Sequence, residues 1–188
     1  KLLMKFFDQK LNDKGLEKGD MDEVVVACAL PVFENWTYGG RMPLFLAEFP
    51  EDVPAYFVDQ QCGSAGTAMS NAAMSIMTGY NKIALCCGFE HMTRVSMNVK
   101  YTKHMKPNLS MISKKSEWYR PQYDILTTIN MLQTAQKLYE QETPTFTKED
   151  LDKFGVRSHN LTIKSQEEGW FTSGVNGGEI IPIEGHEG

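Results

Sequence analysis

Three short apolar runs, separated by segments with helical spacing, constrain the fold of this chain most strongly. The runs lie at residues 23–29, 53–58 and 82–87. Continuous apolar runs of this length are typical of strands that are covered on both faces. The segments between them, residues 41–47 and 62–77, have the composition of helices. This alternation predicts an α/β fold in which helices cover both faces of a sheet.

The rest of the chain is expected to add helices and one terminal strand. These elements are a helix over residues 1–14 that ends at Gly15, helices over 128–141 and 147–168, and an edge strand over 178–183. Thr147, followed three residues later by Asp150, is close to a capping box and predicts a helix start. The α/β rhythm stops after Glu90. We therefore expect a core domain over residues 1–92 and a helical domain over residues 93–188.

Composition and charge exclude several classes of protein. With 41% hydrophobic and 23% charged residues, the chain has a globular composition rather than that of a disordered segment. Its net charge of -5 argues against a nucleic-acid-binding protein, which needs a cationic surface. We expect no transmembrane segment, because no apolar stretch is long enough, and the first residues do not have the pattern of a secretory signal.

The four cysteines are Cys28, Cys62, Cys86 and Cys87, and their spacing fits neither a zinc site nor a redox pair. We therefore expect no metal. A reduced compartment is favoured, either the cytoplasm or, in a eukaryote, the mitochondrial or peroxisomal matrix. Cys28, Cys86 and Cys87 fall within apolar runs. The adjacent pair is interpreted as two strand residues that face opposite sides of the sheet.

Cys62 is the residue best placed to carry chemistry. It follows the second apolar run after a short polar turn, and it begins the small-residue segment that is predicted to be a helix. At a helix N-terminus, unpaired amide groups and the helix dipole stabilise a thiolate. The same amides can hold the oxyanion that forms when a thiolate attacks an acyl carbonyl. The alternative is a buried structural cysteine, and placement alone does not decide between the two interpretations.

The sequence around this cysteine resembles the nucleophile segment of the thiolases, which are acyl-CoA acetyltransferases. Residues 59–66 read Asp-Gln-Gln-Cys-Gly-Ser-Ala-Gly, similar to the Cys-x-Ser-Gly or Cys-Gly-Ser-Gly of that family. Residues 88–92 read Gly-Phe-Glu-His-Met, where thiolases usually have Gly-x-Glu-Ser-Met. The family pattern is also similar around Arg41, at residues 130–135 and at residues 170–182. The resemblance therefore covers essentially all 188 residues.

The resemblance implies both a fold and an activity. The fold would be the first half of a thiolase core, one half of a five-layer αβαβα architecture, with an inserted helical loop domain. The activity would be that of an acyltransferase in which an acyl group passes through a thioester on Cys62, in 3-ketoacyl-CoA thiolysis or in acetyl-CoA condensation. The backbone amide of Cys62 would form part of the oxyanion hole. Coenzyme A and acetyl-CoA would be substrates, with no permanently bound cofactor, and a homodimer or homotetramer is implied.

Part of the thiolase active site does not occur in this sequence. In the family, a second half supplies an Asn-containing loop, a Gly-His segment whose histidine activates the nucleophile, and a second cysteine that moves the substrate proton. No Gly-His-Pro segment occurs here. The resemblance implies that a C-terminal half supplies these groups, on the same polypeptide or on a second chain. The four histidines present are interpreted as surface residues rather than substitutes, namely His91, His104, His159 and His186.

A basic segment lies at residues 94–120, with seven basic residues and one acidic residue. One interpretation is a solvated loop whose lysines keep the protein in solution. The other is an electrostatic funnel for the phosphates of coenzyme A, in which Arg94, Lys100 and Lys103 take part. A membrane or a partner protein would use the same charges.

The departures from the family pattern leave other interpretations open. Cys87 replaces the first glycine of a Gly-Gly pair, and His91 replaces the usual serine. The resemblance places Asn130 and Met131 near the coenzyme, although Asn130 stands where some thiolases carry a histidine. Ketoacyl synthases and hydroxymethylglutaryl-CoA synthases share the fold and the cysteine, but the Gly-x-Glu-x-Met segment favours a thiolase. A non-catalytic thiolase-like subunit that binds acyl-CoA or lipid, or that assists assembly, is the alternative from a different class.

Overall fold

The computed structural model describes residues 1–97, 113–120, 130–141, 146–172 and 178–184. The chain divides into two units. The first comprises residues 1–103 with 181–188, and the second comprises residues 104–180. The expected boundary between residues 92 and 93 stays a prediction. Lys100, Lys103, His104 and His186 lie outside the described residues.

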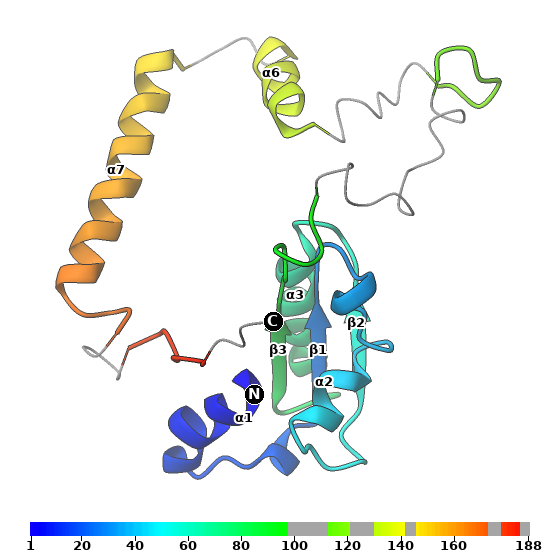
Figure 1. Cartoon of the computed structure of the whole chain (residues 1–188), viewed down its shortest axis with the longest axis vertical. Coiled ribbons are helices and arrows are strands. Elements are labelled where there is room, and N and C mark those ends of the chain that lie inside the picture. Colours follow the sequence, from blue (N-terminus) through cyan, green and yellow to red (C-terminus); the bar gives the residue numbers. More distant parts are fainter. Residues whose placement is uncertain (98–112, 121–129, 142–145, 173–177, 185–188) are drawn as a thin grey trace. The chain divides into compact units, whose positions relative to one another are not determined.

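A parallel sheet organises the first unit and confirms the predicted α/β class. Its strands are β1 (Glu23–Ala27), β2 (Ala55–Val58) and β3 (Ala84–Gly88), in the order β2-β1-β3. All three strands overlap the predicted apolar runs. Because the strands are parallel, their carboxyl ends lie at one edge of the sheet, with the connecting helices packed on its faces (Figure 1).

The central strand β1 is buried from both sides, which explains its unbroken apolar sequence. Val24, Val25 and Val26 have no exposed surface. Val24 and Val26 belong to one hydrophobic cluster, whereas Val25 and Ala27 belong to another. Alternate residues of β1 therefore fill two separate cores, one on each face of the sheet.

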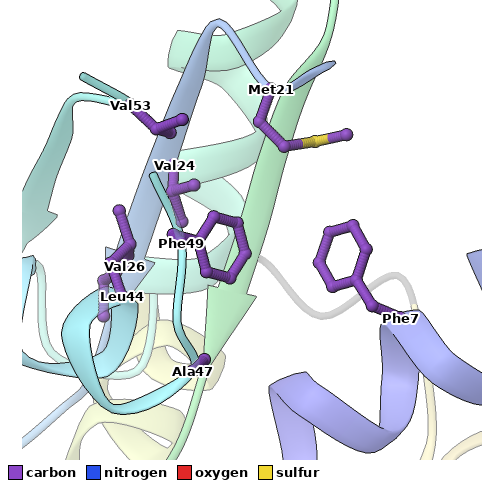
Figure 2. Packing of buried hydrophobic residues seen from close by; sticks show 8 residues of the cluster. All are labelled: Phe7, Met21, Val24, Val26, Leu44, Ala47, Phe49 and Val53. Atoms are coloured by element: carbon purple, nitrogen blue, oxygen red, sulfur yellow. The ribbon is translucent and has the colours of Figure 1, made fainter. Parts of the chain in front are cut away.

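The first core is built from large side chains. Its buried members are Phe7, Met21, Val24, Val26, Leu44, Ala47, Phe49 and Val53. Figure 2 shows Phe49 and Leu44 gathered against β1, with Phe7 extending from the N-terminal helical segment. The rings of Phe7 and Phe49 meet edge to face, with 5.3 Å between centroids. This packing fixes the N-terminal segment against the sheet.

Helix α3 (Ser64–Met77) covers the opposite face of the sheet (Figure 1). Its contacts are small residues, with Ala68 and Ala72 buried against Val25 and Val58. The small side chains bring the helix backbone close to the strands. Cys86 belongs to this core whereas Cys87 belongs to the other, which confirms that the two thiols face opposite sides of β3.

The N-terminal helical segment is less regular than predicted. It is made of α1 (Leu2–Phe6), a π-helical turn η1 (Phe7–Leu11) and a 3-10 turn η2 (Asn12–Lys14). Gly15 ends it in the left-handed conformation, with φ of 70°, as predicted. The described part of the first unit also contains the 3-10 turns η3 (Lys18–Asp20) and η4 (Phe33–Asn35), and helix α2 (Arg41–Leu46).

The second unit contains α6 (Met131–Gln141) and α7 (Lys148–Glu167), as predicted. The Thr147 hydroxyl and the Asp150 carboxylate form the reciprocal capping box at the start of α7. The strand expected over residues 178–183 is wrong, because the described residues there are irregular. The segment makes backbone hydrogen bonds, from the Glu179 amide to the Trp170 carbonyl at 2.9 Å and from the Ile180 amide to the Phe171 carbonyl at 2.8 Å. These bonds do not form the ladder with a neighbouring strand that defines a β-strand. No helix within the described ranges is long and apolar enough to cross a membrane.

Candidate active site

A cavity of about 490 Å³ lies where the three parallel strands end. Its lining comes from the residues at or just after the end of each strand: Ala27, Cys28 and Ala29 after β1, Gln61, Cys62, Ser64 and Ala65 after β2, and Gly88, Phe89 and Glu90 after β3. In open α/β sheets, ligands bind outside the carboxyl ends of the strands. The fold therefore positions Cys62 where this class of protein places its chemistry.

Cys62 is exposed, whereas the other three thiols are buried or half-buried. The expectation that Cys62 begins the helix is wrong by two residues, because α3 begins at Ser64 with Gly63 as its N-cap. Residues 59–63 form a tight turn, in which the Gly63 amide donates to the Gln60 carbonyl at 3.0 Å. Cys62 therefore projects from the turn that leads into the helix rather than from the helix itself.

Gln61, the residue before the cysteine, adopts a left-handed backbone conformation with φ of 51°. Residues other than glycine occupy this region only at a cost, and they cluster at functional sites. The Gln61 amide donates to the Asp59 carboxylate at 3.3 Å, and its carbonyl accepts from the Ser64 amide at 3.1 Å. Hydrogen bonds to the residues before and after it therefore hold Gln61 in this conformation.

Ser64 is the buried anchor of this turn, with 3% of its surface exposed. Its hydroxyl accepts from the Gln60 amide at 2.8 Å and donates to the Gln61 carbonyl at 2.6 Å. The same hydroxyl lies 3.3 Å from the Cys28 carbonyl, at the end of β1. One side chain therefore links the turn that carries Cys62 to the central strand.

The first turn of α3 offers free hydrogen-bond donors beside Cys62. Within the described residues, the Thr67 amide donates to the Gly63 carbonyl, whereas the amides of Ala65 and Gly66 have no acceptor. Unpaired amides at a helix start favour an anion. They are suited to hold a developing oxyanion near the thiol.

Glu90 cross-links the loops that follow β1 and β3. Its carboxylate accepts from the Ala29 amide at 2.8 Å, from Asn35 Nδ2 at 2.7 Å and from the Cys28 thiol at 3.4 Å. Asn35 has no exposed surface, and its side-chain oxygen accepts from the His91 amide at 3.2 Å. This network forms one wall of the cavity, because Cys28, Ala29 and Glu90 line it.

The other three thiols are held in the protonated form. Burial raises the pKa of the Cys28 thiol, and the hydrogen bond to Glu90 adds to the effect, while a backbone bond from Leu30 opposes it. Burial also raises the pKa of Cys86. For Cys87, burial, with a smaller contribution from Cys86, raises the pKa to about 11. A protonated thiol is a poor nucleophile, so these surroundings disfavour attack by Cys28, Cys86 and Cys87.

The residues proposed for coenzyme binding have separate surroundings. Arg94 lies in the first unit, exposed and 3.7 Å from the Glu34 carboxylate. Asn130 lies in the second unit and serves as a helix cap, because its side-chain oxygen accepts from the Leu132 amide at 3.0 Å. Met131 follows it with 60% of its surface exposed. The assignment of these residues to coenzyme A stays a prediction.

No histidine lines the cavity among the residues that the structure describes. The ring of His91 is exposed and lies 3.4 Å from Glu34. His159 is exposed on α7. Both described histidines are surface residues, as predicted.

Three features of the site were not predicted from the sequence. No role was predicted for Asn35, because its partner Glu90 is distant in the sequence and their hydrogen bond depends on the fold. Ser64 was quoted only as part of a motif, and its position two residues after the cysteine gives no sequence signal that its hydroxyl bonds back to Gln60 and Gln61. The left-handed conformation of Gln61 gives no signal in sequence, since glycine is the usual residue there.

Comparisons with known proteins agree with this geometry. Residues 1–188 match the family model described as "Thiolase, N-terminal domain". A 3-ketoacyl-CoA thiolase of Bacillus subtilis is 31% identical over 176 residues, which cover 94% of this chain and 40% of that protein. A probable acetyl-CoA acyltransferase of Staphylococcus aureus is 30% identical over 175 residues, covering 92% of this chain and 42% of that protein.

A solved structure is similar over the whole chain. It is the crystal structure of the Bacillus anthracis acetyl-CoA acetyltransferase, with a TM-score of 0.64 and 24% sequence identity. The match covers 100% of this chain and 46% of that one. The predicted fold, half of a larger α/β architecture, is confirmed. The chain spans about 40% of the length of the relatives that it matches in sequence.

Proposed function

This chain belongs to the thiolase family, whose N-terminal domain it matches along its whole length, and from this premise we propose that it carries the acylated nucleophile of an acyl-CoA acyltransferase. In this proposal, Cys62 accepts the acyl group. The substrates are acyl-CoA thioesters, and no permanently bound cofactor is needed. Homodimer or homotetramer formation and a cytoplasmic or matrix location stay predictions of the family resemblance.

One observation carries the proposal. Of the four cysteines, the exposed one, Cys62, sits on a left-handed turn at the carboxyl edge of the sheet. The amides of Ala65 and Gly66, which have no acceptor among the described residues, lie in the following helical turn. A nucleophile next to oriented backbone donors is the arrangement required for acyl transfer.

The chemistry divides one difficult transfer into two steps. In thiolysis, the Cys62 thiolate attacks the 3-keto carbon of a 3-ketoacyl-CoA. The bond between carbons 2 and 3 breaks, its electron pair goes to carbon 2, and protonation there releases acetyl-CoA. The acyl group remains as a thioester on Cys62. The thiol of a second coenzyme A then attacks this thioester, which releases a shortened acyl-CoA and restores the thiolate. Condensation of two acetyl-CoA molecules is the reverse sequence.

Both steps need a base and a proton shuttle besides Cys62. The described cavity supplies one carboxylate, Glu90, and three donors already bond it. We therefore assign both roles to a C-terminal half, which the longer relatives contain, on the same polypeptide or on a partner chain.

Thiolysis by the full-length protein tests the proposal. Cleavage of acetoacetyl-CoA in the presence of coenzyme A is measured for the wild type, for Cys62→Ala and for Cys86→Ala as a matched control. Removal of the nucleophile should lower kcat by at least about 10³-fold. The half-buried Cys86 lies in the core between α3 and the sheet, so its variant should keep its rate. A wild type that binds acyl-CoA without turnover would favour the non-catalytic subunit instead.

A further inference from the structure

We propose that Ser64 is the positioning residue of this site, and that its hydroxyl holds the Cys62 turn in the geometry needed for attack. This inference rests on the proposed function, because it concerns the same nucleophile. Ser64 does not touch the reacting atoms in this account. It acts through the backbone of the turn.

The first support is the pattern of hydrogen bonds. The Ser64 hydroxyl bonds the backbone of both residues that precede Cys62, at 2.8 Å to the Gln60 amide and 2.6 Å to the Gln61 carbonyl. It also lies 3.3 Å from the Cys28 carbonyl. The turn is therefore tied to the rigid central strand through one hydroxyl.

The second support is the backbone strain at Gln61, whose φ is 51°. Such a conformation persists only where the surroundings over-determine it. Without the hydroxyl, the Gln61 carbonyl keeps the 3.1 Å bond from the Ser64 amide but loses the shorter bond of 2.6 Å. Relaxation of the Gln61 φ toward an ordinary value, with rotation of the Gln61–Cys62 peptide that follows, then becomes easier. That rotation would displace both the thiol and the amide of Cys62.

Ser64 differs from the other side chains that bond the turn, because it is buried and they are exposed. The Asp59 carboxylate accepts from the Gln61 amide, and the Thr67 hydroxyl donates to the Gln60 side chain, but both contacts are exposed. Water can replace an exposed hydrogen bond, whereas the Ser64 hydroxyl is buried. Loss of Ser64 should therefore loosen the turn more than loss of either exposed contact.

The test compares Ser64→Ala with two controls in the full-length protein. Ser70→Ala removes another hydroxyl of α3, one that is exposed and, among the described residues, donates to the Gly66 carbonyl of its own helix. Ala68→Gly removes a buried methyl from α3 without touching the turn, and serves as the control for lost stability. The measurements are iodoacetamide alkylation of Cys62 at neutral pH, followed by peptide mapping, and the kcat and KM of thiolysis.

We expect S64A to slow Cys62 alkylation about ten-fold and to lower kcat about ten- to hundred-fold with KM changed less than about three-fold. S70A and A68G should stay near wild-type values. Wild-type rates in S64A, or equal losses in S64A and A68G, would overturn the proposal. If S64A does not fold, Ser64→Thr decides the matter, because it keeps the hydroxyl. Rates within about three-fold of wild type support the proposal, and a folded but slow S64T contradicts it.

The two readouts separate the inference from the proposed function. Alkylation of Cys62 needs neither acyl-CoA nor catalytic turnover. A protein without thiolysis activity would refute the proposed function, whereas the ratio of alkylation rates between S64A and wild type would still test Ser64.

Discussion

Four cysteines in this chain have distinct surroundings, and the difference decides which one can act. Cys62 is exposed on a strained turn. Cys28 donates to a carboxylate, while Cys86 and Cys87 pack on opposite faces of β3. The residues that flank Cys62 in the sequence were enough to distinguish it from the other three cysteines. The contact between Cys28 and Glu90 could not be predicted in this way, because the two residues are 62 positions apart in the sequence.

Alkylation should discriminate among these thiols. At about pH 8, limiting iodoacetamide should label Cys62 first in the full-length protein, because the raised pKa values of Cys28, Cys86 and Cys87 keep them protonated. Peptide mapping by mass spectrometry measures the order, and prior addition of acetyl-CoA should protect Cys62. Earlier labelling of Cys28 or Cys87 would contradict the nucleophile assignment.

The Cys87 thiol should make stability depend on pH. Its pKa rises from 9.0 to about 11 in the folded state, so the unfolded chain releases the proton first as the pH increases. The free energy of unfolding should therefore fall between pH 9.0 and about 11, by about 2 kcal/mol from this group alone. Urea unfolding of wild type and Cys87→Ala across this range measures the difference. An equal fall of the unfolding free energy in both proteins would refute the role of Cys87.

At the scale of elements, the sequence predicted what depends on local pattern. The strands were expected from the apolar runs, and α3 from the small-residue segment between them. Gly15 ends the N-terminal helical segment and the Thr147 capping box starts α7, both as expected. The start of α3 was misplaced, because it depends on the hydrogen bonds of the turn before Ser64. The strand expected over residues 178–183 was wrong, because a strand depends on a ladder with another strand, whereas the amides of Glu179 and Ile180 bond the carbonyls of Trp170 and Phe171 in an irregular segment.

The junction between α2 and β2 depends on one glycine. Gly40, the N-cap of α2, has φ of 93°. A Cβ atom there would lie 2.9 Å from the carbonyl carbon and oxygen of Tyr56 in β2. Gly39 also has a positive φ, of 64°, but a Cβ atom there would meet nothing within 4 Å. Gly39 and Gly40 therefore both have a strained backbone conformation, but a side chain would collide with β2 only at position 40.

This difference predicts unequal costs for two adjacent substitutions. Gly39→Ala should lower the free energy of unfolding by about 1 kcal/mol through backbone strain. Gly40→Ala should cost at least about 2 kcal/mol more, because its methyl group collides with the backbone of β2. Urea unfolding of the full-length variants measures both. Equal losses would show that close packing of α2 on β2 is not what requires glycine at position 40.

At the scale of the whole molecule, the chain carries the nucleophile side of the proposed active site. The described cavity has Cys62, open amides and a bonded Glu90, and its described lining has no histidine. The relatives are more than twice as long, since the chain covers 40% and 42% of them. We therefore expect residues 1–188 expressed alone to show no acetoacetyl-CoA thiolysis. A spectrophotometric assay beside the full-length protein checks this, and Cys62-dependent turnover by the fragment would disprove it.

The acyl-enzyme itself tests the central claim most directly. The full-length protein is mixed with acetyl-CoA, quenched in acid, digested and mapped by mass spectrometry, with Cys62→Ala as the control. We expect one acetyl group, on the peptide that contains Cys62, and none on that peptide in the variant. Acetylation of another cysteine instead, or no acetylated peptide from a protein that catalyses thiolysis, would contradict the claim that Cys62 is the nucleophile.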